Sequence, residues 1–186
     1  MSVIRRGRRL AAANSKWNVY FDHLADRHGN EVPEYLVIES PYAGADRVTG
    51  ISVLPVVNGS FALLHCYRHP MGSESWEAPR GFIDPMETPV EAALRELGEE
   101  TGLSCDAADL VPLGLYAPEP STMAARGALF AATACRGVAR PPLDEMGLQA
   151  LRLFTPAEMA DLIAAGAIEE AGTLIAYYRY CGLLAR

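Results

Sequence analysis

The sequence contains very little lysine and no closely spaced cysteines. Lys16 is the only lysine among 16 basic residues, and 23 acidic residues bring the net charge to −7 over 186 residues. A chain this acidic lacks the concentrated positive charge that nucleic-acid binding needs, so we expect no nucleic-acid partner. Its apolar runs fall short of the roughly 18 residues that a membrane-spanning helix requires, so we expect no membrane partner.

Cysteine spacing excludes a CxxC metal or redox motif. The cysteines are Cys66, Cys105, Cys135 and Cys181. Because half of the residues are hydrophobic, the chain can bury a core without disulfides, and we expect reduced thiols in a cytoplasmic protein. The arginine-rich residues 1–10 are not followed by the apolar segment of a secretory signal, so we expect them to form a frayed basic terminus.

Two β-rich segments, Trp17–Phe21 and Tyr35–Glu39, flank the turn signal Gly29-Asn30 and predict an antiparallel strand pair. We expect residues 1–45 to form an N-terminal appendage around this pair, which is a candidate dimerisation element. Residues 46–186 are then expected to form the main domain.

The main domain begins with a clear hairpin pattern. β-rich residues 51–57 and 61–67 enclose Asn58-Gly59, which supplies the two positive φ angles of a type I′ turn. Further strands are expected at residues 110–117, 127–135 and 149–154.

The residues that mark the start and end of a helix, its punctuation, are all present around residues 89–101. Thr88 is a good N-cap, Pro89 suits the first helical position, Glu91 completes a capping box and Gly102 ends the helix. The same punctuation recurs over residues 155–166, and a last helix is expected over residues 171–184. Strands that come first, with helices interleaved and late, predict an α+β fold.

The helix over residues 89–101 carries three carboxylates, Glu96, Glu99 and Glu100, on one face. Carboxylates this close repel one another, and a divalent cation such as Mg²⁺ or Mn²⁺ would relieve the repulsion. The alternative is a solvated acidic face with helical ion pairs such as Arg95–Glu99.

The wider spacing distinguishes these alternatives. Gly81 is followed after five residues by Glu87, and seven residues later the chain reads Arg-Glu-Leu-Gly-Glu-Glu-Thr-Gly-Leu over 95–103. This run resembles the signature of the Nudix hydrolases, G-x5-E-x7-R-E-U-x-E-E-x-G-U with U aliphatic, and every specified position matches.

The resemblance implies a Nudix fold, with a mixed β-sheet sandwiched between helices, and an enzyme that hydrolyses a nucleoside diphosphate linked to another group. It implies that Glu96, Glu99 and Glu100 bind Mg²⁺, with Mn²⁺ as the alternative ion, together with the carbonyl oxygen of Arg80. It also implies that Arg95 pairs with Glu87, and that Arg95 and Glu99 belong to the catalytic residues.

The flanking sequence resembles the ADP-ribose pyrophosphatase branch of the family. The resembling segments are residues 53–55, 66–70, 76–103, 144–146, 154–158 and 166–175, with Pro118 placed about 15 residues past the signature. This implies ADP-ribose or a related nucleoside diphosphate sugar as the substrate. Residues 117–121 lack the glycine usual in this branch, so GDP-mannose or another nucleotide substrate, and a non-catalytic ligand sensor, stay as alternatives.

The branch also implies a glutamate in a late loop as general base, and Glu145 matches by position. Asp144 and Glu119 are the alternatives. Candidate substrate ligands are Arg68 and Arg80, whose guanidinium groups match phosphate oxygens, together with Trp17, Pro118 and Glu119. The resemblance further suggests a homodimer formed through the N-terminal strands, with a small-molecule nucleotide as the ligand.

Overall fold

The structure is a computed structural model, and it describes residues 3–137, 139 and 146–185. The chain divides into two compact units. The first consists of Met1–Thr49 with Ala117–Arg126, and the second of Gly50–Tyr116 with Gly127–Arg186. The first compact unit therefore includes residues 117–126 in addition to the N-terminal strands.

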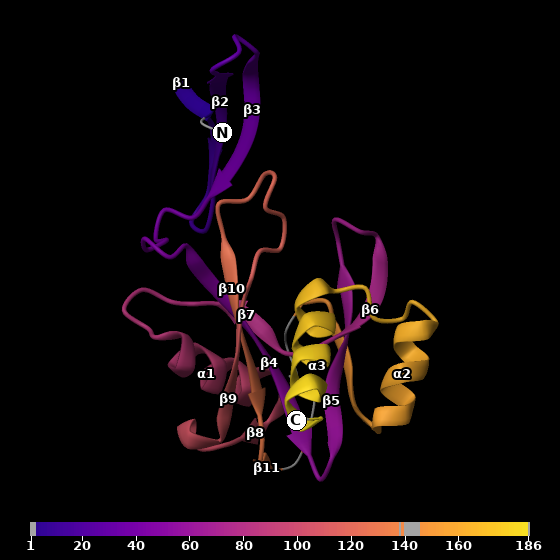
Figure 1. The fold of residues 1–186 in the computed structure, drawn as a ribbon. Coiled ribbons are helices and arrows are strands. Elements are labelled where there is room, and N and C mark those ends of the chain that lie inside the picture. The colour runs from indigo at the N-terminus through magenta and orange to yellow at the C-terminus, as the bar shows by residue number, and fades with distance from the viewer. Residues whose placement is uncertain (1–2, 138, 140–145, 186) are drawn as a thin grey trace. The chain divides into compact units, whose positions relative to one another are not determined.

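The first unit contains an antiparallel sheet in the order β1-β2-β3 (Figure 1). Its strands are β1 (Val3–Ala13), β2 (Asn18–Asp26) and β3 (Glu31–Glu39). The predicted antiparallel pair is present as β2 and β3, with Asn18 opposite Glu39.

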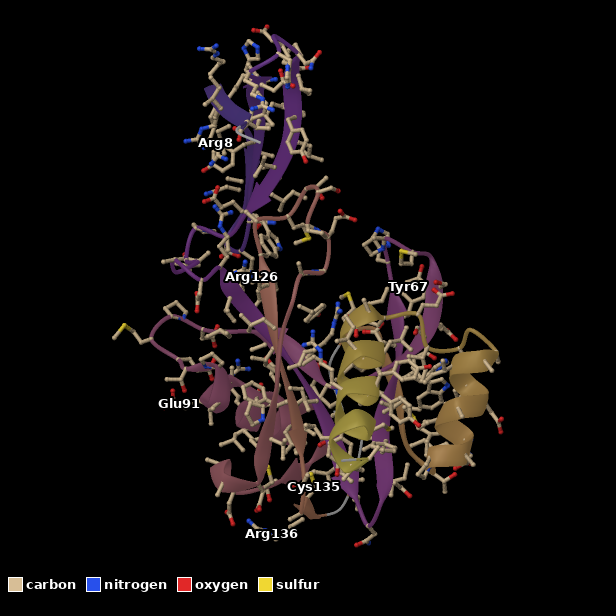
Figure 2. All side chains as sticks on the ribbon, viewed as in Figure 1. Arg8, Tyr67, Glu91, Arg126, Cys135 and Arg136 are labelled. Carbon is tan, nitrogen blue, oxygen red and sulfur yellow. The ribbon has the colours of Figure 1, made fainter. Side chains whose placement is uncertain are left out.

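The expectation of a frayed terminus over residues 1–10 is wrong, because Val3–Ala13 forms β1 against β2. Basic side chains hold this strand in place. Arg8, labelled in Figure 2, donates from Nε to Asp22 Oδ1 at 2.7 Å and from Nη1 to Glu39 Oε2 at 2.7 Å. Asp22 is buried, and its pKa is lowered chiefly by the Arg8 hydrogen bond. Arg8 and Arg9 thus have acidic partners on β2 and β3.

The second sheet runs in the order β12-β5-β4-β10-β9, with β6 paired to β5 and β7 to β4. Its strands are β4 (Val48–Val57), β5 (Ser60–Arg68), β6 (Ser73–Glu77), β7 (Arg80–Phe82), β9 (Leu110–Tyr116), β10 (Arg126–Ala132) and β12 (Leu148–Phe154). Two short strands, β8 (Leu103–Ser104) and β11 (Arg136–Gly137), pair separately. The predicted hairpin is confirmed, since Asn58 and Gly59 have φ values of 50° and 79° between β4 and β5.

Three helices pack on the strands of this sheet and its short companion within the described residues (Figure 1). They are α1 (Pro89–Thr101), which contacts β7 and β8, α2 (Pro156–Ala164), which contacts β5 and β12, and α3 (Ala171–Leu184), which contacts β9. A 3₁₀ turn covers Ala107–Asp109. The core includes Leu54, Leu63, Leu129, Phe154 and Met159, each at most 2% exposed. The predicted α+β fold is confirmed.

The helix ends follow the predicted capping chemistry. Thr88 and Thr155 each form a full capping box, with Glu91 and Glu158 respectively, ahead of a proline. Gly102 ends α1 in the left-handed conformation, with φ 69°. Figure 2 shows Glu91 at the start of α1. These local signals fix the position of α1 and therefore of the acidic residues it carries.

Candidate functional site

Arg95 is the centre of an ionic network at the middle of α1. Its Nε and Nη2 atoms donate to both carboxylate oxygens of Glu87, at 2.9 and 3.0 Å, and Nη2 also donates to Phe82 O at 2.9 Å. Nη1 donates to Glu96 Oε1 at 2.7 Å and to Glu99 Oε2 at 3.1 Å. The pairing of Arg95 with Glu87 expected from the sequence is therefore present.

This network shifts the ionisation of Glu87 and Arg95 toward their charged forms. The Arg95 hydrogen bonds lower the pKa of Glu87, helped by the Asp84 backbone N–H, which donates to Glu87 Oε2 at 2.9 Å. The carboxylates, with Glu87 first, raise the pKa of Arg95. One guanidinium thus joins the loop before α1 to the acidic face of the helix.

Gly81 permits a close approach between this loop and Glu96. A Cβ atom on residue 81 would lie 1.9 Å from Glu96 Oε1 and 2.3 Å from its carboxyl carbon. Any side chain at position 81 would displace the Glu96 carboxylate, which is buried and bound by Arg95. The first glycine of the signature is therefore required by the position of an acidic side chain.

The three acids predicted as metal ligands differ in exposure. Glu96 and Glu100, four residues apart on one helix face, are 9% and 4% exposed, whereas the Glu99 side chain is 61% exposed. Glu100 Oε2 accepts the backbone N–H of Arg80 at 3.0 Å. Because Arg80 immediately precedes Gly81, the two buried acids both lie against the same stretch of β7.

The carboxylate oxygens of Glu96, Glu99 and Glu100 are hard ligands, which suit a divalent cation such as Mg²⁺ that is bound together with the substrate. Among the residues that the structure describes, none form a group of three or more acids, histidines or cysteines arranged to hold a metal by themselves. Arg95 binds Glu96 and Glu99, and the Arg80 N–H occupies Glu100. Mg²⁺ usually binds one or two carboxylates plus waters and substrate phosphates, so a complete protein cage is not required.

Arg68 at the end of β5 is held by an acid that the sequence analysis missed. Its Nη2 donates to Glu77 Oε2 at 2.6 Å, and Nε lies 3.1 Å from both carboxylate oxygens. Glu77, at the end of β6, is only 2% exposed. Its position between Trp76 and Ala78, in an otherwise apolar strand end, was the available signal.

Arg80 has an acidic partner on a different element. Its Nη1 donates to Glu170 Oε1 at 2.9 Å, and its Nε lies 3.5 Å from Glu77 Oε2. Glu170 is the N-cap of α3 and accepts the backbone N–H groups of Gly172 and Thr173. The sequence analysis missed Glu170, which lies 90 residues from Arg80 and beyond the reach of spacing arguments.

The other predicted substrate ligands lie in the first unit. Trp17 precedes β2, and its backbone N–H donates to Asn14 Oδ1 at 2.8 Å. Pro118 and Glu119 are exposed residues of the segment 117–126. The hydrogen bond from the Ser121 hydroxyl lowers the pKa of Glu119. Trp17, Pro118 and Glu119 thus belong to the first unit. The other predicted site residues that the structure describes belong to the second unit: Arg68, Arg80, Arg95, Glu96, Glu99 and Glu100.

The predicted general base, Glu145, and its alternative, Asp144, lie outside the described residues. The chain is described again from residue 146. Gly147 O accepts the Tyr67 backbone N–H at 2.7 Å, immediately before Arg68.

Comparison with known proteins identifies the family. The NUDIX domain model matches residues 46–176, which is more than half of the chain. The chain belongs to the Nudix family. The matched region contains α1, its capping loop and all the arginine and glutamate contacts described for the second unit.

Curated Nudix proteins match over shorter segments. The chain is 43% identical over 67 residues to an ADP-sugar pyrophosphatase of Mus musculus, covering 33% of this chain and 31% of that protein. It is 60% identical over 37 residues to an RNA pyrophosphohydrolase of Erythrobacter litoralis, covering 20% and 23% respectively. The matches thus span about a quarter to a third of these relatives.

A solved structure matches throughout. The crystal structure of an ADP compounds hydrolase superposes with a TM-score of 0.79 at 21% identity, covering 100% of this chain and 95% of the other. This match supports the Nudix fold. None of the helices formed by described residues combines the length and apolar character needed to cross a membrane.

Proposed function

We propose that the chain is a metal-dependent Nudix pyrophosphatase that hydrolyses ADP-ribose or a related nucleoside diphosphate sugar to a nucleoside monophosphate and a sugar phosphate. The observation that carries the proposal is the packing of Glu96 and Glu100 against Arg80 and Gly81, with Arg95 joining the loop to the helix. Burying two carboxylates costs stability, and a binding function explains why they are placed there.

Glu96, Glu99, Glu100 and the Arg80 carbonyl oxygen are the proposed ligands of Mg²⁺ or Mn²⁺, and waters and substrate phosphates would complete the coordination. A bound divalent ion would neutralise phosphate charge and favour deprotonation of water. Arg95 keeps Glu96 and Glu99 oriented through its hydrogen bonds.

Arg68 and Arg80 are proposed to bind the diphosphate. About a third of each side chain is exposed, at 35% and 36%, while Glu77 and Glu170 anchor the guanidinium groups. A guanidinium carries five N–H donors in a planar fork, so one edge can bind a carboxylate while another binds phosphate oxygens.

Trp17, Pro118 and Glu119, which lie in the first unit, are proposed as further substrate ligands because of the family resemblance. The likeness to an ADP-sugar pyrophosphatase and to an ADP compounds hydrolase supports an adenosine diphosphate compound. A second candidate substrate is RNA, because 37 residues of the chain resemble an RNA pyrophosphohydrolase. The net charge of −7 argues against an RNA substrate.

Glu145 is proposed as the general base. It lies two residues before Gly147, whose carbonyl oxygen binds the Tyr67 N–H next to Arg68. Glu145→Gln retains shape and removes the base, so turnover should fall roughly 10²–10⁴-fold with KM little changed. If only Glu119→Gln or Asp144→Asn lowers turnover, the base is one of those residues.

A homodimer is proposed through the N-terminal sheet. Strand β1 is an edge strand with exposed apolar residues, among them Val3 at 59%, Ile4 at 48% and Leu10 at 55%. Sedimentation equilibrium should give a mass near twice 20.1 kDa for the intact chain. A monomer at micromolar concentration would contradict this proposal.

The decisive experiment is a product assay over a substrate panel with Mg²⁺. The panel contains ADP-ribose, GDP-mannose, nucleoside triphosphates and a 5′-triphosphate RNA, with excess chelator as control. We expect AMP and ribose 5-phosphate from ADP-ribose, and no hydrolysis in chelator. Preferred cleavage of RNA or a triphosphate would overturn the substrate assignment, and ADP-ribose binding without hydrolysis would indicate a sensor.

A further inference from the structure

The segment just before Gly81 is hydrogen-bonded to α1 and to the start of α3, two helices that are far apart in the sequence. The Arg80 backbone N–H binds Glu100 of α1 at 3.0 Å, and the Arg80 guanidinium binds Glu170 at the start of α3 at 2.9 Å. One residue therefore connects the acidic helix to the C-terminal helix.

The Glu170 carboxylate accepts more hydrogen bonds than helix capping alone requires. Its Oε2 accepts the Thr173 N–H at 2.6 Å and the Thr173 hydroxyl at 2.8 Å, while Oε1 accepts both the Gly172 N–H at 2.9 Å and Arg80 Nη1. Its side chain is 11% exposed. The helix N-terminus fixes the carboxylate, and the fixed carboxylate restricts the arginine.

The backbone before Arg80 is attached to the same place. Thr173 Oγ1, which donates to Glu170, also accepts the Ala78 N–H at 2.9 Å. Earlier in this segment, the Trp76 N–H binds Ala167 O at 3.0 Å. The position of Arg80 is therefore set by residues 167–173 as well as by α1.

We infer that Glu170 is a positioning residue that orients the Arg80 guanidinium toward the phosphates of a nucleoside diphosphate. This inference rests on the proposed function, because it concerns the diphosphate ligand of the same site. Within the described residues, the Arg80 guanidinium donates to Glu170 from Nη1, its Nε lies 3.5 Å from Glu77 Oε2, and 36% of the side chain is exposed. The remaining donors can face a ligand. Without Glu170, the Arg80 side chain would keep only its longer contact with Glu77, and the ligand would have to order the rest of the guanidinium, which weakens binding.

The test is a double-mutant cycle with Glu170→Asp and Arg80→Met. Aspartate is a preferred N-cap residue, so Glu170→Asp retains the helix cap and the charge but withdraws the carboxylate from Arg80. We expect Glu170→Asp to raise the Kd for ADP, measured by titration calorimetry with Mg²⁺, roughly tenfold, as for a lost charge-assisted hydrogen bond. The KM for ADP-ribose should rise equally, with kcat little changed, because phosphate is held in both ground and transition states.

Coupling separates positioning from a merely structural role. In the Arg80→Met background, Glu170→Asp should produce no further change in Kd or KM, because its partner is gone. Additive effects of the two substitutions would overturn the inference. Glu158→Gln is the matched control, since Glu158 caps α2 and pairs with Arg152 at 2.6 Å as Glu170 does with Arg80; it should leave both constants unchanged.

The outcomes also separate this inference from the proposed function. If the wild-type chain hydrolyses none of the panel yet binds ADP with the expected coupling, the function fails and the positioning role stands. If hydrolysis occurs with additive effects, only the positioning role fails. If the chain neither hydrolyses the panel nor binds ADP, both are overturned. If Glu170→Asp does not fold, Glu170→Gln replaces it in the same cycle.

Discussion

Helices α1 and α2 begin alike and bury different side chains. Each opens with a Thr-Pro pair and a glutamate that completes the capping box. Helix α2 buries Met159, whereas α1 buries Glu96 and Glu100 in addition to apolar residues such as Leu97. The same capping residues thus set where each helix starts, and the residues on the buried face indicate the role of the helix. A buried methionine serves packing, and two buried carboxylates require a ligand or ionic partners.

Neutralising a buried acid of α1 should have the largest effect. Glu100→Gln retains an oxygen for the Arg80 N–H but removes the charge, so turnover should fall at least about a hundredfold, as for a lost metal ligand. Glu158→Gln on α2 should leave turnover unchanged, because glutamine also completes a capping box. Steady-state kinetics and circular dichroism check both. A fully active Glu100→Gln, or wild-type activity in excess chelator, would refute the metal-site proposal.

A methyl group at position 81 should disturb the carboxylate facing it. Gly81→Ala places Cβ 1.9 Å from Glu96 Oε1. Since the contact is the end of a side chain, we expect a stability cost of about 1 kcal/mol, the low end for overpacking, but a turnover loss of about tenfold or more from misplaced Glu96.

The matched control for this glycine is Gly182→Ala in α3, where an added Cβ meets no atom within 4 Å. That change should stabilise the protein by about 0.5–1 kcal/mol, because alanine favours helix interiors. Urea denaturation measures both. Equal effects of the two substitutions would mean that the Gly81 contact is not decisive.

The Arg95–Glu87 pair should make stability depend on acid pH. Arg95 lowers the pKa of Glu87 in the folded state, so the pair contributes stability above the ordinary value of 4.5, and this contribution is lost as pH falls through the lowered value. In Arg95→Gln, the decrease of Tm between pH 6 and pH 3 should be shallower than in the wild type. Thermal melts in a pH series check this, and parallel curves would contradict it.

The two capping threonines should show effects on stability that are similar to each other. Thr88→Ala and Thr155→Ala should each lower the free energy of unfolding by about 1 kcal/mol. Thr155→Ala should keep full turnover, because α2 carries none of the proposed site residues. A large difference between the two unfolding energies would show that the caps are not equivalent.

Local signals in the sequence predicted most of the fold that positions the site. The bounds of α1 and the Asn58-Gly59 turn follow from capping and turn chemistry over a few residues. Strand β1 was missed because its arginines look solvated until Asp22 and Glu39 are brought beside Arg8. Charge patterns along one segment do not reveal partners on another.

The candidate site divides in the same way. The contact between Arg95 and Glu99 follows from helical i,i+4 spacing, and the pairing of Arg95 with Glu87 was implied by the family resemblance. Glu77 and Glu170 were missed because their roles depend on tertiary contacts with Arg68 and Arg80. Glu170 would be read from the sequence only as a helix cap, a role that it also fills.

The bond between Arg80 and Glu170 also has a consequence for how the protein is made. Ribosomes add about 5–20 residues per second, so the 90 residues between the two partners take roughly 5 to 20 seconds to synthesise. During that interval the loop before α1 can already meet Glu100, but its arginine has no C-terminal anchor. Vectorial synthesis therefore completes the proposed site only at a late stage, and a nascent chain stalled before residue 170 would carry the whole Nudix signature with the Arg80 guanidinium lacking its Glu170 partner.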